Sequence, residues 1–158
     1  MVRKKEITVD NTDVKILQCL MKNARANSSE IAEKVKLSTS TVIERIKKLE
    51  NSGVIKGYAA IIVPEKLGKD VISVAIDHPK FNDGFVAAVK DNRHIAECLY
   101  IAGEFDYFLK VVTDNTKTLE SVLNEIKSIP GVSKTQTSIV LSSPKNEYSV
   151  PIKAKKEK

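Results

Sequence analysis

The chain has 158 residues, of which 42% are hydrophobic and 29% charged, and its formal net charge is +6. This length allows one medium domain or two small ones, and no apolar run approaches the roughly 20 residues that a membrane span needs, which argues against a transmembrane protein. Residues 1–70 hold 14 Lys and Arg against 9 Asp and Glu, whereas residues 71–150 hold 8 against 10, so the charge favours a polyanion-binding first half joined to a near-neutral second half.

The basic N-terminus is followed by polar residues where a secretory signal would carry an apolar stretch. Arg3, Lys4 and Lys5 come first, and Asp10 and Asp13 follow. Because no secretory signal is recognised here, the protein is expected to be cytoplasmic.

Three short helices are predicted next. Apolar residues recur at three- and four-residue intervals over residues 10–23, 28–35 and 39–51, which is the period of one buried helical face. Ser28 and Ser38 are placed to cap the second and third helices. The last two helices are separated by a tight turn, which is typical of a helix-turn-helix whose final helix enters the major groove of DNA.

The outward face of the third helix combines two kinds of side chain suited to DNA. Small hydroxyl residues near its N-terminus can approach base edges, and cations further along can meet phosphates. Arg45 is the expected leading contact, because its planar guanidinium can bind a guanine edge or a phosphate with two parallel hydrogen bonds. A plain solvated face is the alternative for the lysines. The predicted DNA-binding residues are Ser38, Thr39, Ser40, Thr41, Glu44, Arg45, Lys47 and Lys48.

Gly53 is expected to end the third helix, and residues 54–63 then change to an apolar, strand-like run that predicts a β wing. Residues 64–70 contain proline, glycine and charged residues and are expected to connect two domains. The expected organisation is a winged helix-turn-helix domain over residues 1–63, a linker over 64–70, a second domain over 71–150, and a basic tail over 151–158 to which no site is assigned.

The second domain is predicted from strand and helix patterns in alternation. Strand-like runs occupy residues 71–76, 95–102, 107–113 and 132–141, with helical patterns around 85–89 and 119–126. The order βαββαβ predicts a ferredoxin-like unit with helices on one face of an antiparallel sheet, so the fold class is α+β. The other face would remain bare and apolar, and a homodimer is expected to cover it.

Neither a catalytic site nor a metal site is predicted. His78 and His94 are isolated, and Cys19 and Cys98 lie far apart in apolar segments, where two buried thiols are expected. The sequence contains no HExxH motif, no glycine-rich phosphate loop and no GxSxG elbow. We therefore expect a protein that is not an enzyme and that holds no cofactor and no metal.

Several segments together resemble the Lrp/AsnC (feast/famine) family of transcriptional regulators. Residues 102–109, 129–132 and 135–141 are similar to the regulatory (RAM) domain of that family, so that the resemblance extends from about residue 9 to residue 141. The segments similar to its DNA-binding half are Val9-Asp10-x-x-Asp13-x-x-Ile16-Leu17, Asn23-Ala24-Arg25, Glu30-Ile31-Ala32, Leu37-Ser38-x-Ser40-Thr41-Val42, and Arg45-Ile46-Lys47-Lys48-Leu49-Glu50-x-x-Gly53-Val54-Ile55-x-Gly57-Tyr58.

The resemblance implies dimers, commonly assembled into rings of four that make an octamer, with an amino acid or similar metabolite bound between dimers. Asp106 would be the partner of the effector's ammonium group. An ordinary turn aspartate and ordinary strand threonines are the alternative interpretation. By the family's motifs, the effector pocket would be lined by Gly103, Glu104 and Asp106 in the hairpin loop and by Thr135, Gln136 and Thr137 on the last strand.

The function predicted from the sequence is a sequence-specific regulator of transcription that binds double-stranded DNA and whose oligomeric state responds to an amino acid. The alternative is an architectural protein that compacts DNA without an effector. Such a protein would share the basic first half and would differ in salt dependence and sequence discrimination. RNA binding is less favoured, because the strands of the second half lack aromatic pairs that could stack on bases.

Overall fold

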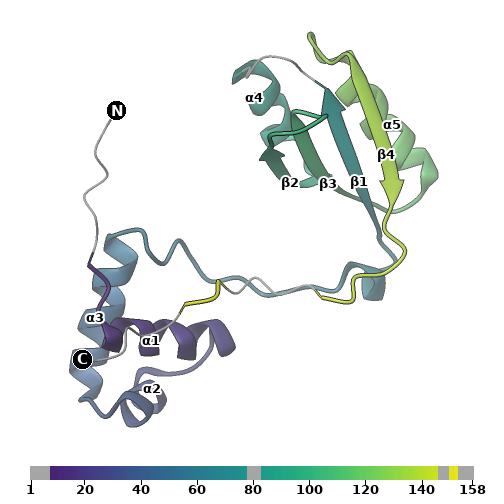
Figure 1. Cartoon of the computed structure of the whole chain (residues 1–158). Helices are drawn as coiled ribbons and strands as arrows, with labels where there is room; N and C mark the ends of the chain where they lie inside the picture. Colours follow the sequence, from purple (N-terminus) through teal and green to yellow (C-terminus); the bar gives the residue numbers. More distant parts are fainter. Residues whose placement is uncertain (1–7, 78–82, 146–149, 153–158) are drawn as a thin grey trace. The chain divides into compact units, whose positions relative to one another are not determined.

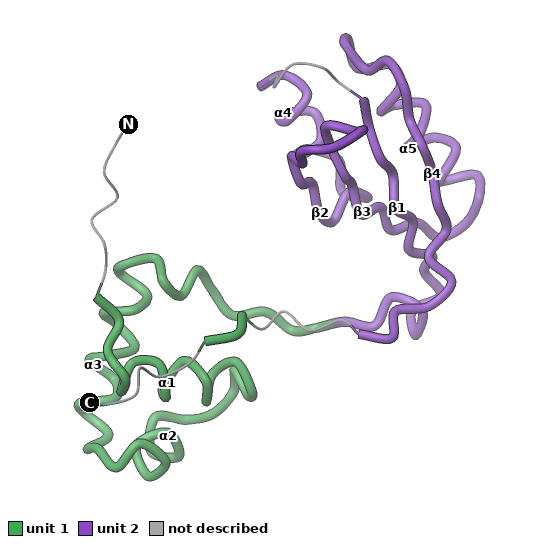
Figure 2. The backbone as a smooth tube through the Cα atoms, viewed as in Figure 1, with its two compact units in different colours: residues 1–61, 147–158 green, residues 62–146 purple. Residues whose placement is uncertain are grey.

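The computed structural model of the chain describes residues 8–77, 83–145 and 150–152. The chain divides into two compact units, unit 1 with Met1–Ile61 and Glu147–Lys158, and unit 2 with Ile62–Asn146 (Figure 2). No helix within the described ranges is long and apolar enough to span a membrane. Among the residues discussed above, those outside the described residues are Arg3, Lys4, Lys5, His78 and the tail from Lys153 onward.

The described part of unit 1 contains three helices, α1 (Asn11–Lys22), α2 (Ser28–Val35) and α3 (Thr39–Asn51). Each buries one apolar face in a common core, where Ile16, Ile31 and Val42 are fully buried. Helices of this length are marginal in water by themselves, so this shared core is what stabilises them. The three helices predicted from apolar spacing are confirmed.

Side chains cap the start of each of these helices. Asp10 and Asp13 form a capping box at α1, in which Asp13 N donates to Asp10 Oδ1 at 2.7 Å and Asp10 N donates to Asp13 Oδ2 at 3.2 Å. Ser38 caps α3 as predicted, accepting from Thr41 N at 3.2 Å. The cap predicted for α2 was wrong, because Asn27, not Ser28, accepts from Glu30 N at 2.9 Å. Asn and Ser cap helices about equally well, so their order in the sequence did not decide between them.

Gly53 follows α3 with a left-handed backbone (φ 75°), as expected for a helix end. The wing strand expected after it is not formed, since residues 54–63 are all described and none pairs in the sheet. A strand obtains its hydrogen bonds from a neighbouring strand, and the described part of unit 1 contains helices and no strand. Ile61, Ile62 and Val63 are therefore more than half exposed.

The described C-terminal residues 150–152 belong to unit 1. Gln18 Nε2 on α1 donates to the backbone oxygen of Ile152 at 3.1 Å. This contact joins residues that are 134 positions apart in the chain, a separation that sequence patterns do not register.

Within its described residues, unit 2 contains four antiparallel strands in the spatial order β2-β3-β1-β4, with two α-helices (Figure 1). The predicted order βαββαβ is therefore confirmed. A short 3-10 helix, η1 (Pro64–Leu67), precedes these elements. In chain order they are β1 (Asp70–Asp77), α4 (Asp83–Asp91), β2 (Ile95–Tyr100), β3 (Tyr107–Thr113), α5 (Thr116–Ser128) and β4 (Lys134–Ile139).

Helices α4 and α5 cover one face of this sheet. The rings of Phe85 and Tyr107 pack with their centroids 4.5 Å apart and their planes tilted by 41°. Burying this apolar surface is the main favourable contribution to the folding of unit 2. The core consists of Phe85 and Val89 from α4, Val122 and Ile126 from α5, and Ile72, Val74, Ile76, Tyr107, Leu109 and Val111 from the sheet.

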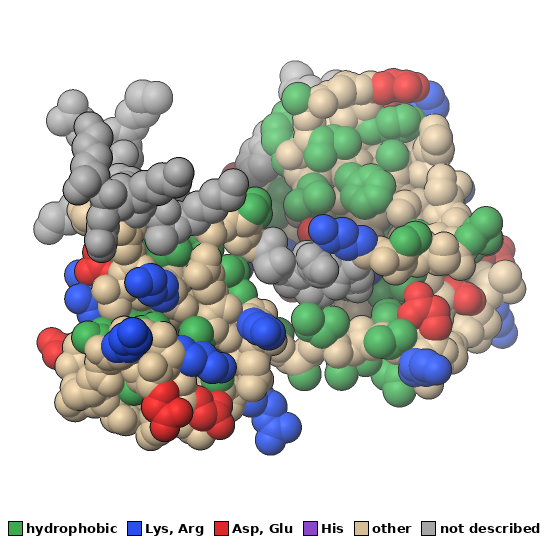
Figure 3. Space-filling view, turned by 60° about the horizontal axis from the view of Figure 1, so that its bottom comes forward, with side chains coloured by type: hydrophobic (Ala, Val, Ile, Leu, Met, Phe, Trp, Pro, Cys, Tyr) green, Lys and Arg blue, Asp and Glu red, His purple; other side chains and the backbone are tan. Residues whose placement is uncertain are grey.

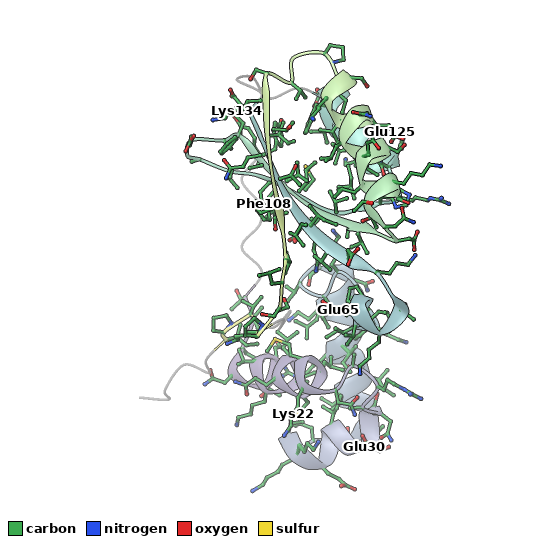
Figure 4. The ribbon with its side chains drawn as sticks, turned by 90° about the vertical axis from the view of Figure 1, so that its right-hand side faces the viewer. Lys22, Glu30, Glu65, Phe108, Glu125 and Lys134 are labelled. Carbon is green, nitrogen blue, oxygen red and sulfur yellow. The ribbon has the colours of Figure 1, made fainter. Side chains whose placement is uncertain are left out.

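The opposite face of the sheet, which we call the open face, has no helix over it among the described residues. Side chains alternate between the two faces of a strand, so Phe108 lies on the open face, paired with Ala75 on β1 and Leu99 on β2. Figure 4 shows Phe108 on the side of the sheet away from α5, and Figure 3 shows hydrophobic side chains gathered on the surface of unit 2. The apolar residues of the open face are Val71, Ala75, Leu99, Phe108 and Val112.

Candidate functional site

The outward face of α3 carries most of the residues predicted to bind DNA. Val42 and Leu49 are buried in the core of unit 1, and Ile46 packs against it, which turns the other side of the helix to solvent. The predicted contacts that are exposed on this side are Thr39, Ser40, Glu44, Lys47 and Lys48. One helix thus presents hydroxyls, a carboxylate and two ammonium groups together, a set that can meet both base edges and phosphates.

Three hydroxyl groups meet at the start of α3. Ser38 Oγ lies 2.7 Å from Thr41 Oγ1 and 3.0 Å from Ser40 Oγ. Because Ser38 also accepts from Thr41 N, its hydroxyl stabilises the first turn of the helix. Ser38 and Thr41 therefore have a structural task in addition to the DNA contact predicted for them.

Arg45 is placed differently from the sequence-based expectation. Its Nη1 donates to Asp10 Oδ2 and to Asp13 Oδ1, both at 2.7 Å. The Asp13 side chain is only 2% exposed, whereas those of Arg45 and Asp10 are 30% and 49% exposed. The guanidinium thus connects the middle of α3 to the capping box of α1, and its contact with a base stays a prediction.

The ionisation of this group, the Arg45 clamp (Arg45, Asp10 and Asp13), follows from its hydrogen bonds. The backbone N–H of Asp13 and then Arg45 hold the pKa of Asp10 below its ordinary value. Hydrogen bonds to Asp10 and then Asp13 raise the pKa of Arg45. Asp10 and Arg45 are therefore both charged at neutral pH. All three residues lie in the segments that resemble the family, but the sequence did not predict that Arg45 contacts Asp13 and Asp10, which lie 32 and 35 positions away.

A second side-chain hydrogen bond holds the C-terminal end of α3. Tyr58 OH donates to Glu50 Oε1 at 2.9 Å, which attaches the segment after Gly53 to the helix. Partial burial, and then the neighbouring Glu50 carboxylate, raise the pKa of Tyr58 to about 12. This contact was not predicted from the sequence, where the only hint of it is a tyrosine in an otherwise apolar run.

Replacing Tyr58 by phenylalanine should remove this hydrogen bond and lower the free energy of unfolding by about 0.5 kcal/mol, the low end for a hydrogen bond, because the residue is 49% exposed. The folded pKa is raised, so this contribution is complete below about pH 10, where the unfolded tyrosine ionises, and is lost as the pH rises through about 12. An ultraviolet titration of both proteins measures the difference. If the tyrosine ionisation that is lost in Tyr58→Phe occurs near pH 10 in the native chain, the contact with Glu50 is contradicted.

The predicted effector residues lie partly together at one end of the sheet of unit 2. The hairpin loop after β2 contacts the end of β1, where Asp106 N donates to Ile76 O at 2.9 Å. The backbone oxygen of Asp106 accepts from Ile101 N at 2.8 Å. Thr135 on β4 pairs with the same Ile76 from the other side. Gly103, Glu104, Asp106 and Thr135 are therefore brought to one region, which we call the effector region.

The remaining two predicted residues lie further along β4. Gln136 pairs with Ala75 and Thr137 pairs with Val74. Neighbouring residues of a strand point to opposite faces, so Gln136 lies on the open face while Thr135 and Thr137 lie on the face of the helices. The three β4 residues consequently do not share one surface within a single chain.

Lys134 joins the effector region and was not predicted. Its Nζ lies 3.4 Å from Glu104 Oε1 and 5.0 Å from the centre of the Phe105 ring. This ion pair and cation–π contact connect β4 to the hairpin loop across the end of β1. Apart from its chain neighbours, a Cβ at Gly103 would meet no atom within 4 Å, so the space beside this glycine is open within a single chain.

Two hollows of about 550 and 350 Å³ are found on unit 2, away from the effector region. Both are lined by Arg93 and His94, and the larger also by Lys117 and Glu125. None of the six predicted effector residues lines either hollow.

The histidine and cysteine side chains of the described ranges form no group suited to a metal ion. His94 Nδ1 lies 3.2 Å from Val112 O, within hydrogen-bond distance. Cys19 and Cys98 are free thiols and are half-buried, less than the full burial expected, and burial raises the pKa of Cys98.

Comparisons with known proteins cover both units. A family described as "Winged helix-turn-helix DNA-binding" matches residues 9–56, and one described as "Lrp/AsnC ligand binding domain" matches residues 71–150. The HTH-type transcriptional regulator FL11 of Pyrococcus abyssi is 38% identical, over 93% of this chain and 99% of that protein. The leucine-responsive regulatory protein of Haemophilus influenzae is 32% identical, over 97% of this chain and 96% of that protein. Both relatives carry the names of regulators.

Solved structures agree with these matches. A transcriptional regulator of Neisseria meningitidis in complex with L-methionine superposes with a TM-score of 0.83 at 34% identity, over 91% of this chain and 97% of that one. AsnC of E. coli superposes with a TM-score of 0.78 at 30% identity, over 89% of this chain and 97% of that one. The similarity therefore extends over both units in sequence and in structure.

Proposed function

The chain belongs to the Lrp/AsnC family of DNA-binding transcriptional regulators, and on that premise we propose that it reads specific DNA sites through α3 and responds to an amino acid through the effector region. The outward face of α3 supports this proposal most directly. Thr39, Ser40 and Glu44 lie toward the N-terminal half of the helix, where bases are approached, and Lys47 and Lys48 follow.

The proposed operator follows from self-association. The open face leaves Phe108 and its apolar neighbours uncovered within one chain, and a second copy of this chain would remove that surface from water. A two-fold dimer would present two α3 helices, which fit half-sites about one helical turn apart, or a multiple of it, in a roughly palindromic site. We further propose that dimers assemble into rings of four, as in the family that the sequence resembles.

The proposed effector is an amino acid bound in the effector region and completed by another copy of the chain. The regulator from Neisseria meningitidis, which binds L-methionine, supports this class of ligand. Asp106 and Glu104 offer carboxylates for an ammonium group, and Lys134 offers an ammonium for a carboxylate. Such a ligand changes DNA binding only if it binds two oligomeric arrangements with different affinity.

Two exposed lysines of α3 allow a test of the DNA-binding face. Lys47→Ala and Lys48→Ala should each lower the slope of log affinity against log salt concentration by about one for each protomer, and so by about two for a dimer, because each phosphate contact releases about one condensed counterion. Lys22→Ala on α1, labelled in Figure 4, is the matched control and should leave the slope unchanged. Gel-shift titrations at several salt concentrations measure all three.

The same titrations separate the proposed regulator from an architectural protein. A regulator should bind a site selected from a random library much more tightly than unrelated DNA, and one amino acid should change that affinity selectively. Equal affinity for all sequences and no response to any of the twenty amino acids would favour the architectural function. Unchanged salt slopes in both α3 variants would contradict the proposed face.

A further inference from the structure

Ile43 is an apolar side chain on the outward face of α3. It is 41% exposed, and it lies outside the apolar core of unit 1, in which the preceding Val42 is fully buried. Ile46, one turn later, packs against that core. The third helix therefore presents one large aliphatic group to solvent beside the polar residues predicted to bind DNA.

The neighbours of Ile43 define its surroundings. Residues three and four positions apart adjoin on a helix surface, so Ser40 precedes Ile43 and Lys47 follows it on the same face, both exposed. Ile43 lies in the second turn of α3, within the N-terminal half that a helix-turn-helix presents to base edges. Arg45, two residues later, turns toward α1 and does not share this face.

Helix stability does not account for an isoleucine at this position. Isoleucine is a poorer helix former than Ala, Lys or Glu, because its branched Cβ loses side-chain freedom. An exposed aliphatic group gains free energy only when a partner removes it from water. In the major groove the 5-methyl group of thymine is the apolar feature that a base pair displays.

We propose that Ile43 contacts the 5-methyl group of a thymine in each half-site, and so selects a T·A pair at one position. This inference rests on the proposed function, in which α3 enters the major groove. Ser40 and Lys47, on either side, would hold the helix by polar contacts while Ile43 reads the methyl group. This contact would make binding depend on a thymine methyl group, in addition to the hydrogen bonds and phosphate contacts that the other residues of the face can make.

The test removes one methyl group from the DNA. A site is first selected from a random-sequence library with the full chain, and each thymine is then replaced in turn by deoxyuridine, which has the same hydrogen-bonding groups and no 5-methyl. At one position per half-site, the deoxyuridine substitution should weaken binding of the native chain about fourfold. Burial of one methyl-sized group contributes ~0.8 kcal/mol, and about 1.4 kcal/mol corresponds to a tenfold change in affinity.

The variant Ile43→Ala should bind the thymine and deoxyuridine sites equally, and Ile43→Val should retain part of the discrimination. Met21→Ala is the matched control, since Met21 is 40% exposed on α1, and it should discriminate as the native chain does. Alanine favours the helix, so circular dichroism should show α3 intact in Ile43→Ala.

Two results would overturn the inference alone: selective binding in which no deoxyuridine substitution weakens the native chain, or an Ile43→Ala variant that keeps the full discrimination. Failure of the library to yield any preferred site would overturn the proposed sequence-specific function together with it. The two results that would overturn the inference alone are read from the same binding curves.

Discussion

Replacing Arg45 by alanine should lower the free energy of unfolding by about 2–3 kcal/mol and weaken DNA binding as a consequence. The substitution leaves the carboxylate of Asp13, whose side chain is 2% exposed, without its guanidinium. Loss of one partner of a buried ion pair typically costs about 3–5 kcal/mol, and the 30% exposure of the Arg45 side chain reduces that figure. Urea denaturation followed by the helical circular dichroism signal measures the change.

A double-mutant cycle separates the clamp from a direct DNA contact. Arg45→Met keeps the aliphatic stem and removes the charge, and Asp13→Asn removes the buried carboxylate charge. If the clamp acts as a unit, the two substitutions together should destabilise the chain by less than the sum of their separate effects. Native stability in Arg45→Ala combined with a loss of affinity for one base pair would instead show that Arg45 acts chiefly as a base contact.

Acid should reduce the difference between the native chain and Arg45→Ala. The folded pKa of Asp10 is lowered, so its contribution to stability is present above the unfolded value of about 3.9 and is lost as the pH falls through the lowered folded value. The destabilisation by Arg45→Ala should therefore be largest near neutral pH and smaller below about pH 4. The same denaturation experiment at several pH values measures this dependence.

Local patterns predicted the three helices of unit 1 and the βαββαβ order of unit 2, but they did not predict the contacts between distant residues. The helix over residues 39–51 could be predicted because its apolar spacing, its Ser38 cap and Gly53 all agree. The wing strand was predicted and is not formed, because the apolar run at 54–63 indicates a strand but does not supply a partner for it. Arg45 was assigned to DNA because a guanidinium suits both a base and a carboxylate, and only the fold brings Asp10 and Asp13 to it.

The effector residues show the same limit. The hairpin loop and β4 were identified as motifs, and the fold brings Asp106 and Thr135 to opposite sides of Ile76. Side chains of β4 alternate between the two faces of the sheet, so Gln136 and Thr135 lie on opposite faces. The motif alone did not predict which face each residue takes. Lys134 was missed because its partners, Glu104 and Phe105, lie in the hairpin loop, about 30 positions away.

Introducing a charge at the centre of the open face should have the largest effect on assembly. Phe108→Glu places a carboxylate between Ala75 and Leu99, where the proposed dimer would exclude water. Burying an unpaired charge is costly enough that the dissociation constant should rise by about a hundredfold or more, equivalent to about 3 kcal/mol. Phe108 is on the face opposite the core of unit 2, so each chain should stay folded. Sedimentation velocity over a range of concentrations measures the change.

The control adds the same charge on the helix-covered side of the sheet. Ser121→Glu on α5 is exposed and should leave the association of the chains unchanged. In the dimer, two α3 helices share one palindromic site, so Phe108→Glu should also lose its preference for paired half-sites over a single half-site, while each α3 still binds DNA weakly. If Phe108→Glu sediments as the native assembly does, the open face is not the surface through which the copies associate, and the spacing of the half-sites must be set by another part of the chain.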